Sequence, residues 1–449
     1  MNKKDFNSIR NEFDNQIKSF DSSEKSNQNI FSICFEIEND LNKTLNRISL
    51  KHQPIVFSSS NFLAFSIVKE HSFSFYNEYD YKSQKDELLK SISNTCFIND
   101  KKNNKTFIFG GFNFDLSESN TDIWNDIPIA NFILPRYTFI NSKLVVNIFL
   151  DDGITIEKIK SLFLKYIDDL ELILFARKNK DIKSELLDVS NLTSHDSHHK
   201  KITNLLDIFK TGNSDLIKVV FSRIKKVSFS DNLPLLDIYK NLLNKNDNSM
   251  NFLYPVSSNI NIIGSTPELI FSKLNHNIES ESIAGSNYSK NNDFTSDEKE
   301  VIEQKIVTDY IIDFLNENSD NITYNKKPKI KKSSDIEHLY TSFSANLVND
   351  KNILDLLGEI HPTPAIGGYP KDKAFDMIRK YKENRGWYGG PIGWIDNNLD
   401  GRFYLNIRSG LGINKNLYLF SGSGITEKSN ADNEWDETEE KFKLMLESL

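Results

Sequence analysis

Glycine is concentrated in one stretch of this chain, and that stretch constrains the fold most strongly. Twelve of the 18 glycines lie between Gly358 and Gly424, and three of the four tryptophans also lie late in the chain. Glycine permits positive φ and the close approach of two backbones. A glycine-dense region beside aromatic residues therefore predicts tight turns around a ligand, and the alternative is a series of hairpins.

The composition predicts a folded protein and excludes several kinds of partner. Hydrophobic residues make up 38% and aromatic residues 12% of the chain, so disorder is not expected. The net charge is −8 and there is no basic stripe, which argues against a nucleic-acid or membrane surface. No stretch approaches the about 18 apolar residues of a membrane span, and no apolar run follows the N-terminal lysines. We expect a cytoplasmic protein, monomeric by default, with Cys34 and Cys96 as reduced thiols.

Short strands and helices alternate in the predicted secondary structure of residues 1–200. The apolar stretch Lys105–Leu116 predicts a strand, and its Gly110-Gly111 pair predicts a bulge or turn. The polar stretch Leu187–Lys200 predicts a linker or surface loop, in which His195, His198 and His199 are solvated instead of binding a metal. Other predicted elements are helices at 6–20 and 154–178 and a strand at 144–150. Within 131–140, the segment Leu134-Pro135-Arg136 predicts the end of one strand and the start of another.

Residues 201–449 contain the chemically informative segments. Helices are predicted at 201–210, closed by Gly212, and at 293–317, 371–381 and 434–446. Strands are predicted at 216–223, 252–256, 260–263, 269–274, 329–334, 390–395, 403–409 and 417–421.

Two residues at predicted strand ends suggest acid–base chemistry. Lys218 lies in an apolar strand, where desolvation favours the neutral amine that acts as a base. The alternative is an edge-strand lysine that reaches solvent. Glu268 follows the turn Gly264–Pro267 and precedes an apolar run, so its carboxyl could retain a proton and donate it. The alternative is a carboxylate that caps the turn.

Two pairs of glutamates suggest a metal site. Glu300 and Glu303 lie one turn apart on one predicted helix, and Glu434 and Glu437 lie one turn apart on another. If the two faces meet, they form an oxygen-rich site that suits Mg²⁺ together with a substrate carboxylate. Such pairs are common among 63 acidic residues, however, and Glu437 could simply pair with Lys441.

Two further features suggest anion binding. Arg408 lies in an apolar strand, and its guanidinium matches the geometry of a carboxylate. Gly422-Ser423-Gly424 follows a strand and could offer backbone N–H groups to an anion.

The order of these segments resembles the chorismate-utilising enzymes, which include isochorismate, anthranilate, aminodeoxychorismate and salicylate synthases. The resemblance is firm over residues 201–449 and faint over residues 1–200. It rests on nine motifs: Lys218-Val219-Val220, Ser265-Thr266-Pro267-Glu268, Ala284-Gly285-Ser286, Lys299-Glu300 with Glu303, His361–Pro370, Arg385–Trp394, Ile407-Arg408, Gly422–Gly424 and Glu434–Lys441.

The resemblance implies an α/β (α+β) chorismate-binding fold, with large antiparallel sheets flanked by helices and a site in a central cleft. Residues 1–200 would complete the same fold as the catalytic region 201–449. It also implies Mg²⁺ as cofactor, held by Glu303 and Glu437 with Glu300 and Glu434 nearby. Chorismate would be the substrate, bound by Ser286, Ala365, Ile407, Arg408, Gly422 and Lys441.

The same resemblance points to isochorismate synthase, with Lys218 as base and Glu268 as acid, in menaquinone or siderophore biosynthesis. Family members that use ammonia usually carry Gln at the position of Lys218, and aminodeoxychorismate synthases carry a nucleophilic Lys at that of Ala284. Water is therefore the expected nucleophile. Salicylate synthase and a catalytically silent chorismate-binding protein are the alternatives. Three positions depart from the usual family residues, namely Ser286 (Thr), Ser423 (Ala) and Gln304 (His), which bears on substrate positioning more than on reaction type.

Overall fold

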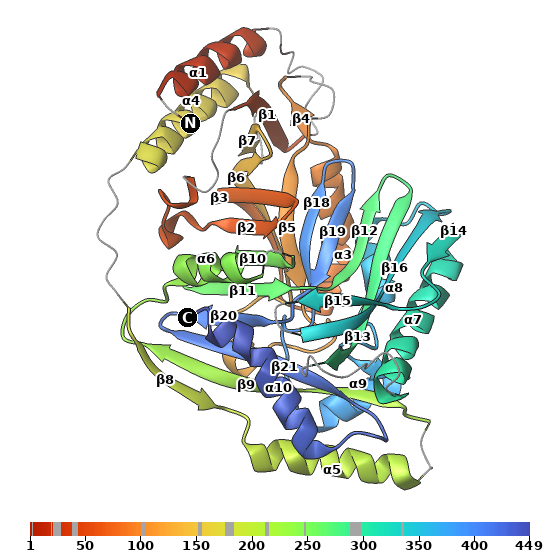
Figure 1. Ribbon diagram of the computed structural model, residues 1–449. Coiled ribbons are helices and arrows are strands. Elements are labelled where there is room, and N and C mark those ends of the chain that lie inside the picture. The colour runs from red at the N-terminus through yellow and green to blue at the C-terminus, as the bar shows by residue number, and fades with distance from the viewer. Residues whose placement is uncertain are drawn as a thin grey trace.

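Antiparallel strands dominate the protein, and helices pack around them (Figure 1). The computed structural model describes all residues except 2, 19, 21–27, 38–43, 100–103, 151–154, 176–183, 212–214, 247, 288–297 and 334–335. The α-helices are α1 (Lys3–Ile17), α3 (Glu78–Ser93), α4 (Ile156–Phe175), α5 (His195–Thr211), α6 (Leu235–Lys245), α7 (Glu298–Asn318), α8 (Ile353–Ile360), α9 (Lys371–Lys380) and α10 (Ala431–Leu446).

The strands occur throughout the described residues. They are β1 (Ile30–Glu36), β2 (Ile55–Ser59), β3 (Phe62–Phe75), β4 (Cys96–Phe97), β5 (Phe107–Phe112), β6 (Ala130–Ile140), β7 (Lys143–Phe149), β8 (Leu186–Asn191), β9 (Lys218–Phe229), β10 (Met250–Pro255), β11 (Ile260–Thr266), β12 (Leu269–Leu274), β13 (Asn277–Asn287), β14 (Ser319–Tyr324), β15 (Lys329–Ser333), β16 (Ile336–Leu347), β17 (Gly368–Tyr369), β18 (Pro391–Asp396), β19 (Gly401–Leu405), β20 (Ser409–Ile413) and β21 (Asn416–Ile425).

Strand β6 is the branch point of the sheet. One arm runs from β6 through β3, β2, β10, β11, β20 and β21 to β9. The other arm runs through β5, β18, β19, β12 and β13 to β16. Every pairing among the described strands is antiparallel except that of β1 with β4. The expected mixed α/β fold with large antiparallel sheets and flanking helices is confirmed.

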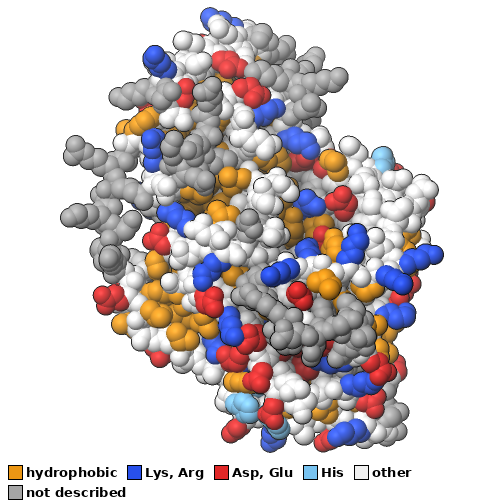
Figure 2. All heavy atoms as spheres, in the orientation of Figure 1, with side chains coloured by type: hydrophobic (Ala, Val, Ile, Leu, Met, Phe, Trp, Pro, Cys, Tyr) orange, Lys and Arg blue, Asp and Glu red, His pale blue; other side chains and the backbone are white. Residues whose placement is uncertain are grey.

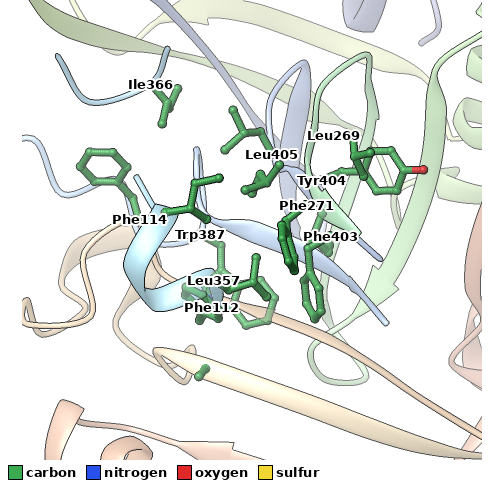
Figure 3. Close-up of a cluster of buried hydrophobic side chains, with 14 of the residues drawn as sticks. Phe112, Phe114, Leu269, Phe271, Leu357, Ile366, Trp387, Phe403, Tyr404 and Leu405 are labelled. Atoms are coloured by element: carbon green, nitrogen blue, oxygen red, sulfur yellow. The ribbon is translucent and has the colours of Figure 1, made fainter. Parts of the chain in front are cut away.

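Strands from residues 1–200 are built into both arms. Strand β2 pairs with β10 through Val56–Ser58, and β5 pairs with β18 through Phe107–Gly111. The buried side chains form two large apolar clusters. Figure 3 shows part of the first cluster, in which Phe271 of β12 and Phe403 of β19 lie side by side as register partners.

The Gly110-Gly111 pair lies within a regular strand, so the predicted bulge or turn is wrong. Strand β5 pairs with β6 and β18 through these residues without any register shift. The glycines are needed because neighbouring backbones lie very close. A Cβ at Gly110 would lie 2.2 Å from the Asn131 carbonyl oxygen, and one at Gly111 would lie 2.1 Å from that of Pro391.

Three other predictions of local structure are also wrong. Residues 131–140 belong to one strand, β6, which continues through Leu134-Pro135-Arg136 while it pairs with β3. Residues 187–200 are not a loop, because β8 pairs with β9 and α5 begins at His195. His198 is fully buried there and lies against Trp435 of α10. The predicted strand 403–409 is two strands, β19 and β20, and Arg408 between them has φ of +49°.

Several other expectations can be compared only in part. Gly212, the predicted end of a helix, and Asp293, the predicted start of another, lie outside the described residues. Both cysteines are buried and reduced.

None of the helices in the described ranges is both long and apolar enough to cross a membrane. Lys and Arg side chains lie among Asp and Glu side chains on the face shown in Figure 2.

The glycine contacts make a prediction about stability. Gly110→Ala should lower the free energy of unfolding by about 1–3 kcal/mol, because the methyl group overlaps the backbone of β6. The control is Gly358→Ala in helix α8, where a Cβ meets no atom within 4 Å. This change should stabilise the protein by about 0.5–1 kcal/mol, since alanine favours helix. Urea unfolding measures both, and equal stability of the two variants would contradict the role given to Gly110.

Candidate active site

A cavity lies where the two arms of the sheet meet again. Strands β9 and β21 of one arm and β13 and β16 of the other line it, together with helices α7 and α10. The empty space of this cavity, including its open mouth, is about 650 Å³. The lining residues are Val220, Pro267, Glu268, Ile283, Ala284, Gly285, Ser286, Glu303, His338, Ala365, Ile366, Tyr388, Ile407, Arg408, Phe420, Ser421, Gly422, Gly424, Glu437 and Lys441.

Most residues that sequence analysis singled out line this one cavity. They include the six predicted substrate contacts (Ser286, Ala365, Ile407, Arg408, Gly422 and Lys441), the predicted acid Glu268 and the two predicted metal ligands Glu303 and Glu437. The other three, Lys218, Glu300 and Glu434, are not among the lining residues. Lys218 and Glu300 each contact a lining residue, and the charge of the lining residue Glu437 acts on Glu434.

Lys218 lies directly behind the cavity wall. Its side chain is fully buried, and its Nζ lies 2.7 Å from Oε1 of Glu303. Gly424 of β21 makes room for this pair, because a Cβ there would lie 2.6 Å from Lys218 Cε and 2.4 Å from Glu303 Oε1. The alternative of an edge-strand lysine in solvent is therefore wrong.

The position and the raised pKa of Glu268 suit a proton donor. It precedes β12, its side chain is 4% exposed, and its backbone carbonyl accepts a hydrogen bond from Leu405 N–H. Burial, helped by the charge of Glu281, raises the pKa of Glu268 to about 8, against the opposing charges of nearby lysines. A carboxyl group with this pKa is mostly protonated at neutral pH and loses its proton as the pH rises through about 8.

The two glutamate pairs on α7 and α10 come together beside the cavity. Burial and then the charge of Glu303 raise the pKa of Glu300 to about 7. Burial and the charge of Glu437 raise that of Glu434. Burial also opposes ionisation of Glu437, but Lys441 and Lys299 outweigh it and lower its pKa. The carboxylates thus crowd one another.

Lysines compensate for this negative charge. Lys299 lies 2.9 Å from Glu434 and 3.7 Å from Glu300, and Lys441 lies 2.5 Å from Glu437. The pairing of Glu437 with Lys441, foreseen as an alternative to metal binding, is therefore present. Glu300 also accepts a hydrogen bond of 2.7 Å from the Ser286 backbone N–H. That bond fixes Glu300 to the wall of the cavity.

The donor set fits a hard divalent cation bound together with substrate. Glu303 and Glu437 both face the cavity and offer only oxygen atoms. Among the described residues, no group of three or more His, Cys, Asp or Glu side chains is arranged to hold a metal ion. Mg²⁺ commonly takes one or two carboxylates and completes its coordination with substrate oxygens and water. The crowded carboxylates at this wall suit that mode of binding.

Arg408, His338 and Ser286 form a connected row along the cavity. An Arg408 Nη atom lies 3.4 Å from His338 Nε2, and His338 Nδ1 lies 3.2 Å from Ser286 Oγ and 3.1 Å from the Gly285 carbonyl oxygen. Burial, and then the charges of Arg408 and Lys441, lower the pKa of His338 to about 3, so the ring is neutral. Nδ1–H can then donate to Gly285 while Nε2 accepts from Arg408. Sequence analysis missed His338, which carries no local signal within the strand.

The departures from the usual family residues are accommodated locally. The Ser286 hydroxyl keeps a partner in His338. Gln304 points away from the cavity and its Nε2 donates to Ser282 Oγ at 3.0 Å and Thr341 Oγ1 at 3.1 Å. Ser423 is completely buried in β21.

Aromatic residues form another part of the wall. Tyr388 and Phe420 stack with ring centroids 5.2 Å apart, and Trp124 stacks on Phe420 at 5.3 Å. Gly386, with φ of +47°, lies against the Trp124 indole where a Cβ would clash. Trp124 comes from the first 200 residues, so this part of the chain supports the cavity. Neither Trp124 nor Tyr388 was a candidate from sequence.

The sequence of this chain is similar to those of known chorismate-binding enzymes. The sequence profile of the family described as "Chorismate binding enzyme" matches residues 15–449. Isochorismate synthase MenF of Bacillus subtilis is 28% identical over 359 residues, covering 76% of this chain and 74% of that protein.

Two solved structures share the fold. The menaquinone-specific isochorismate synthase MenF of Escherichia coli superposes with a TM-score of 0.77 at 17% identity, covering 98% of this chain and 100% of that one. Anthranilate synthase component I of Streptococcus pneumoniae gives 0.67 at 19% identity, covering 93% and 92%. With the profile match over nearly the whole sequence, the chain belongs to the family of chorismate-binding enzymes.

Proposed function

We propose that this protein is an isochorismate synthase, which converts chorismate reversibly to isochorismate with Mg²⁺ as cofactor. One observation carries the proposal, namely that a buried lysine lies directly behind the wall of a cavity that is lined by a carboxyl group with a pKa raised to about 8. Exchange of a hydroxyl group between ring positions needs one base and one acid. Sequence relatives named isochorismate synthase support the same reaction.

The proposed reaction balances with these two residues. Lys218, as the neutral amine, accepts a proton from water while the water oxygen bonds to C2 of chorismate. The ring double bonds shift and the bond from C4 to its hydroxyl oxygen breaks. Glu268 gives its proton to that oxygen, which leaves as water. General base and acid catalysis of this kind contributes about 10²–10⁴-fold each.

Glu303 connects the cofactor to the base. Glu303 and Glu437 would hold Mg²⁺, which would neutralise the ring carboxylate of chorismate. Glu303 Oε1 also lies 2.7 Å from the Nζ of Lys218, so the proposed base would stand next to the bound cation.

The remaining charges of the cavity suit a dicarboxylate. Arg408, between β19 and β20, and Lys441 of α10 supply positive charge, and the backbone carbonyl of Gly422 accepts a hydrogen bond from Lys441. Ser286, Ala365 and Ile407 complete the contacts proposed for chorismate. The product would serve menaquinone or siderophore biosynthesis.

Product analysis tests the proposed function directly. The purified protein with chorismate and Mg²⁺ should form isochorismate without ammonia, detected by chromatography against standards. Salicylate together with pyruvate would instead identify a salicylate synthase. Absence of any product over a range of Mg²⁺ concentrations would identify a silent chorismate-binding protein, and either result contradicts the proposal.

The role of Lys218 is tested by substitution within strand β9. Lys218→Ala should lower kcat by about 10²–10⁴-fold, because water loses its base. Lys225→Met is the control, since Lys225 lies on the same strand, is mostly buried and pairs with Glu439 away from the cavity. This control should keep wild-type activity. Hydration of chorismate by Lys218→Ala at the rate of the control would refute the assignment of the base.

The metal assignment is tested on helices α7 and α10. Glu303→Ala and Glu437→Ala should abolish both activity and the rise in melting temperature that Mg²⁺ and chorismate together give the wild type. Glu440→Ala is the control, because Glu440 lies on α10 and pairs with Lys443 outside the cavity. If Mg²⁺ stabilised the Glu303 and Glu437 variants as it does this control, these residues would not be the ligands.

A further inference from the structure

A charged cluster lies directly behind the proposed acid. Lys331 of β15 donates one hydrogen bond of 2.9 Å to the carbonyl of Pro267, the residue before Glu268, and another of 2.7 Å to Glu281 Oε2. Tyr340 of β16 donates a hydrogen bond of 3.1 Å to Glu281 Oε1. The Lys331 ammonium also lies 4.9 Å from the Tyr340 ring centroid. Side chains from three strands thus form one cluster, and Lys331 connects this cluster to the backbone next to Glu268.

The cluster faces away from the substrate cavity. Glu281 and Tyr340 line a separate cleft, together with Leu269 of β12. The side chains of Lys331 and Glu281 are 24% and 17% exposed, so their charges are only partly screened by water. None of the three residues lines the cavity. They can therefore act on Glu268 without touching the substrate.

The charged groups around Glu268 divide into two sets. Lys218 and Lys441 act on it from the cavity side, where Glu303, Glu437, Arg408 and the neutral His338 also lie. Glu281 and Lys331 act on it from behind, with opposite signs. The first set has roles in binding or base catalysis in the proposed function. The second set has none, and its two charges are the ones that can adjust the acid independently.

We propose that Glu281 and Lys331 are positioning residues that set the proton affinity of Glu268. Lys331 holds the Pro267 carbonyl and so fixes the backbone of the acid. The Glu281 charge opposes ionisation of Glu268 and keeps the proton available, whereas the Lys331 charge prevents the proton from being held too tightly for donation. This inference rests on the proposed function, since it concerns the acid of that reaction.

The test is the pH dependence of kcat/KM for chorismate in two variants. Glu281→Gln removes a negative charge, so Glu268 ionises more readily. The limb of the pH profile that reports ionisation of Glu268 therefore moves to lower pH. Lys331→Met removes a positive charge, so the same limb moves to higher pH. A displacement of about 0.5 pH unit or more is expected in each case, given charges that are partly exposed. Residues that only supported the fold would lower the rate without moving the limb in opposite directions.

Two further variants serve as controls. Glu279 lies two residues from Glu281 on β13 and pairs with Arg402 at the surface. The pH profile of Glu279→Gln should therefore match that of the wild type. Lys331→Arg keeps the positive charge and should restore the wild-type limb. If Lys331→Met does not fold, the direction of the shift in Glu281→Gln decides alone.

The outcomes separate this inference from the proposed function. Limbs that coincide with the wild type, or that move in the same direction in Glu281→Gln and Lys331→Met, would overturn the inference even if isochorismate forms. A wild-type protein that forms no isochorismate would refute the proposed function itself. Opposite displacements, with an unchanged Glu279→Gln profile, would establish the role of the cluster.

Discussion

Mutual compensation of buried charges is the constraint on which the site depends. The cavity brings Lys441 and Arg408 together with Glu303 and Glu437, and Lys218 lies just behind its wall. Taking one such charge out of water costs several kcal/mol unless an opposite charge lies close. The short pairs of Lys218 with Glu303 and of Lys441 with Glu437 meet this requirement. A dicarboxylate that binds with Mg²⁺ adds no net charge, so the proposed substrate complex preserves this balance while the partners exchange.

The architecture explains how residues so far apart in sequence reach one cavity. Strands β9 and β21 pair over ten positions, and Gly424 faces Val220 across that ladder. Strand β13 of the other arm brings Ala284–Ser286 to the opposite wall, and β16 beside it supplies His338. Helices α7 and α10 add the carboxylates from outside the sheet. These walls are regular elements, whereas Glu268, Ala365, Tyr388, Ile407 and Arg408 lie on the connections between such elements.

Sequence analysis selected residues that lie together in the fold, although it predicted several local elements wrongly. The motifs placed nine proposed site residues on one cavity because their order along the chain is specific, although each residue alone has an ordinary explanation. His338, Glu281 and Lys331 were missed since their importance arises only from the pairing of β13, β15 and β16. The error at residues 187–200 has a similar cause. That stretch is polar, but it gains order from pairing with β9 and from packing of α5 against α10.

The branching of the sheet at β6 has a consequence for how the chain acquires its structure. Gly111 of β5 pairs with Ile392 of β18, and Phe57 of β2 pairs with Phe252 of β10. Such distant partners make the contact order high, which slows folding because long loops must close before these contacts form. During synthesis, β5 has an unpaired edge until the residues after about 390 have emerged. Exposed strand edges promote association between chains. We therefore expect the yield of folded protein to depend strongly on temperature and on chaperones. The stability of the finished fold should depend on them less.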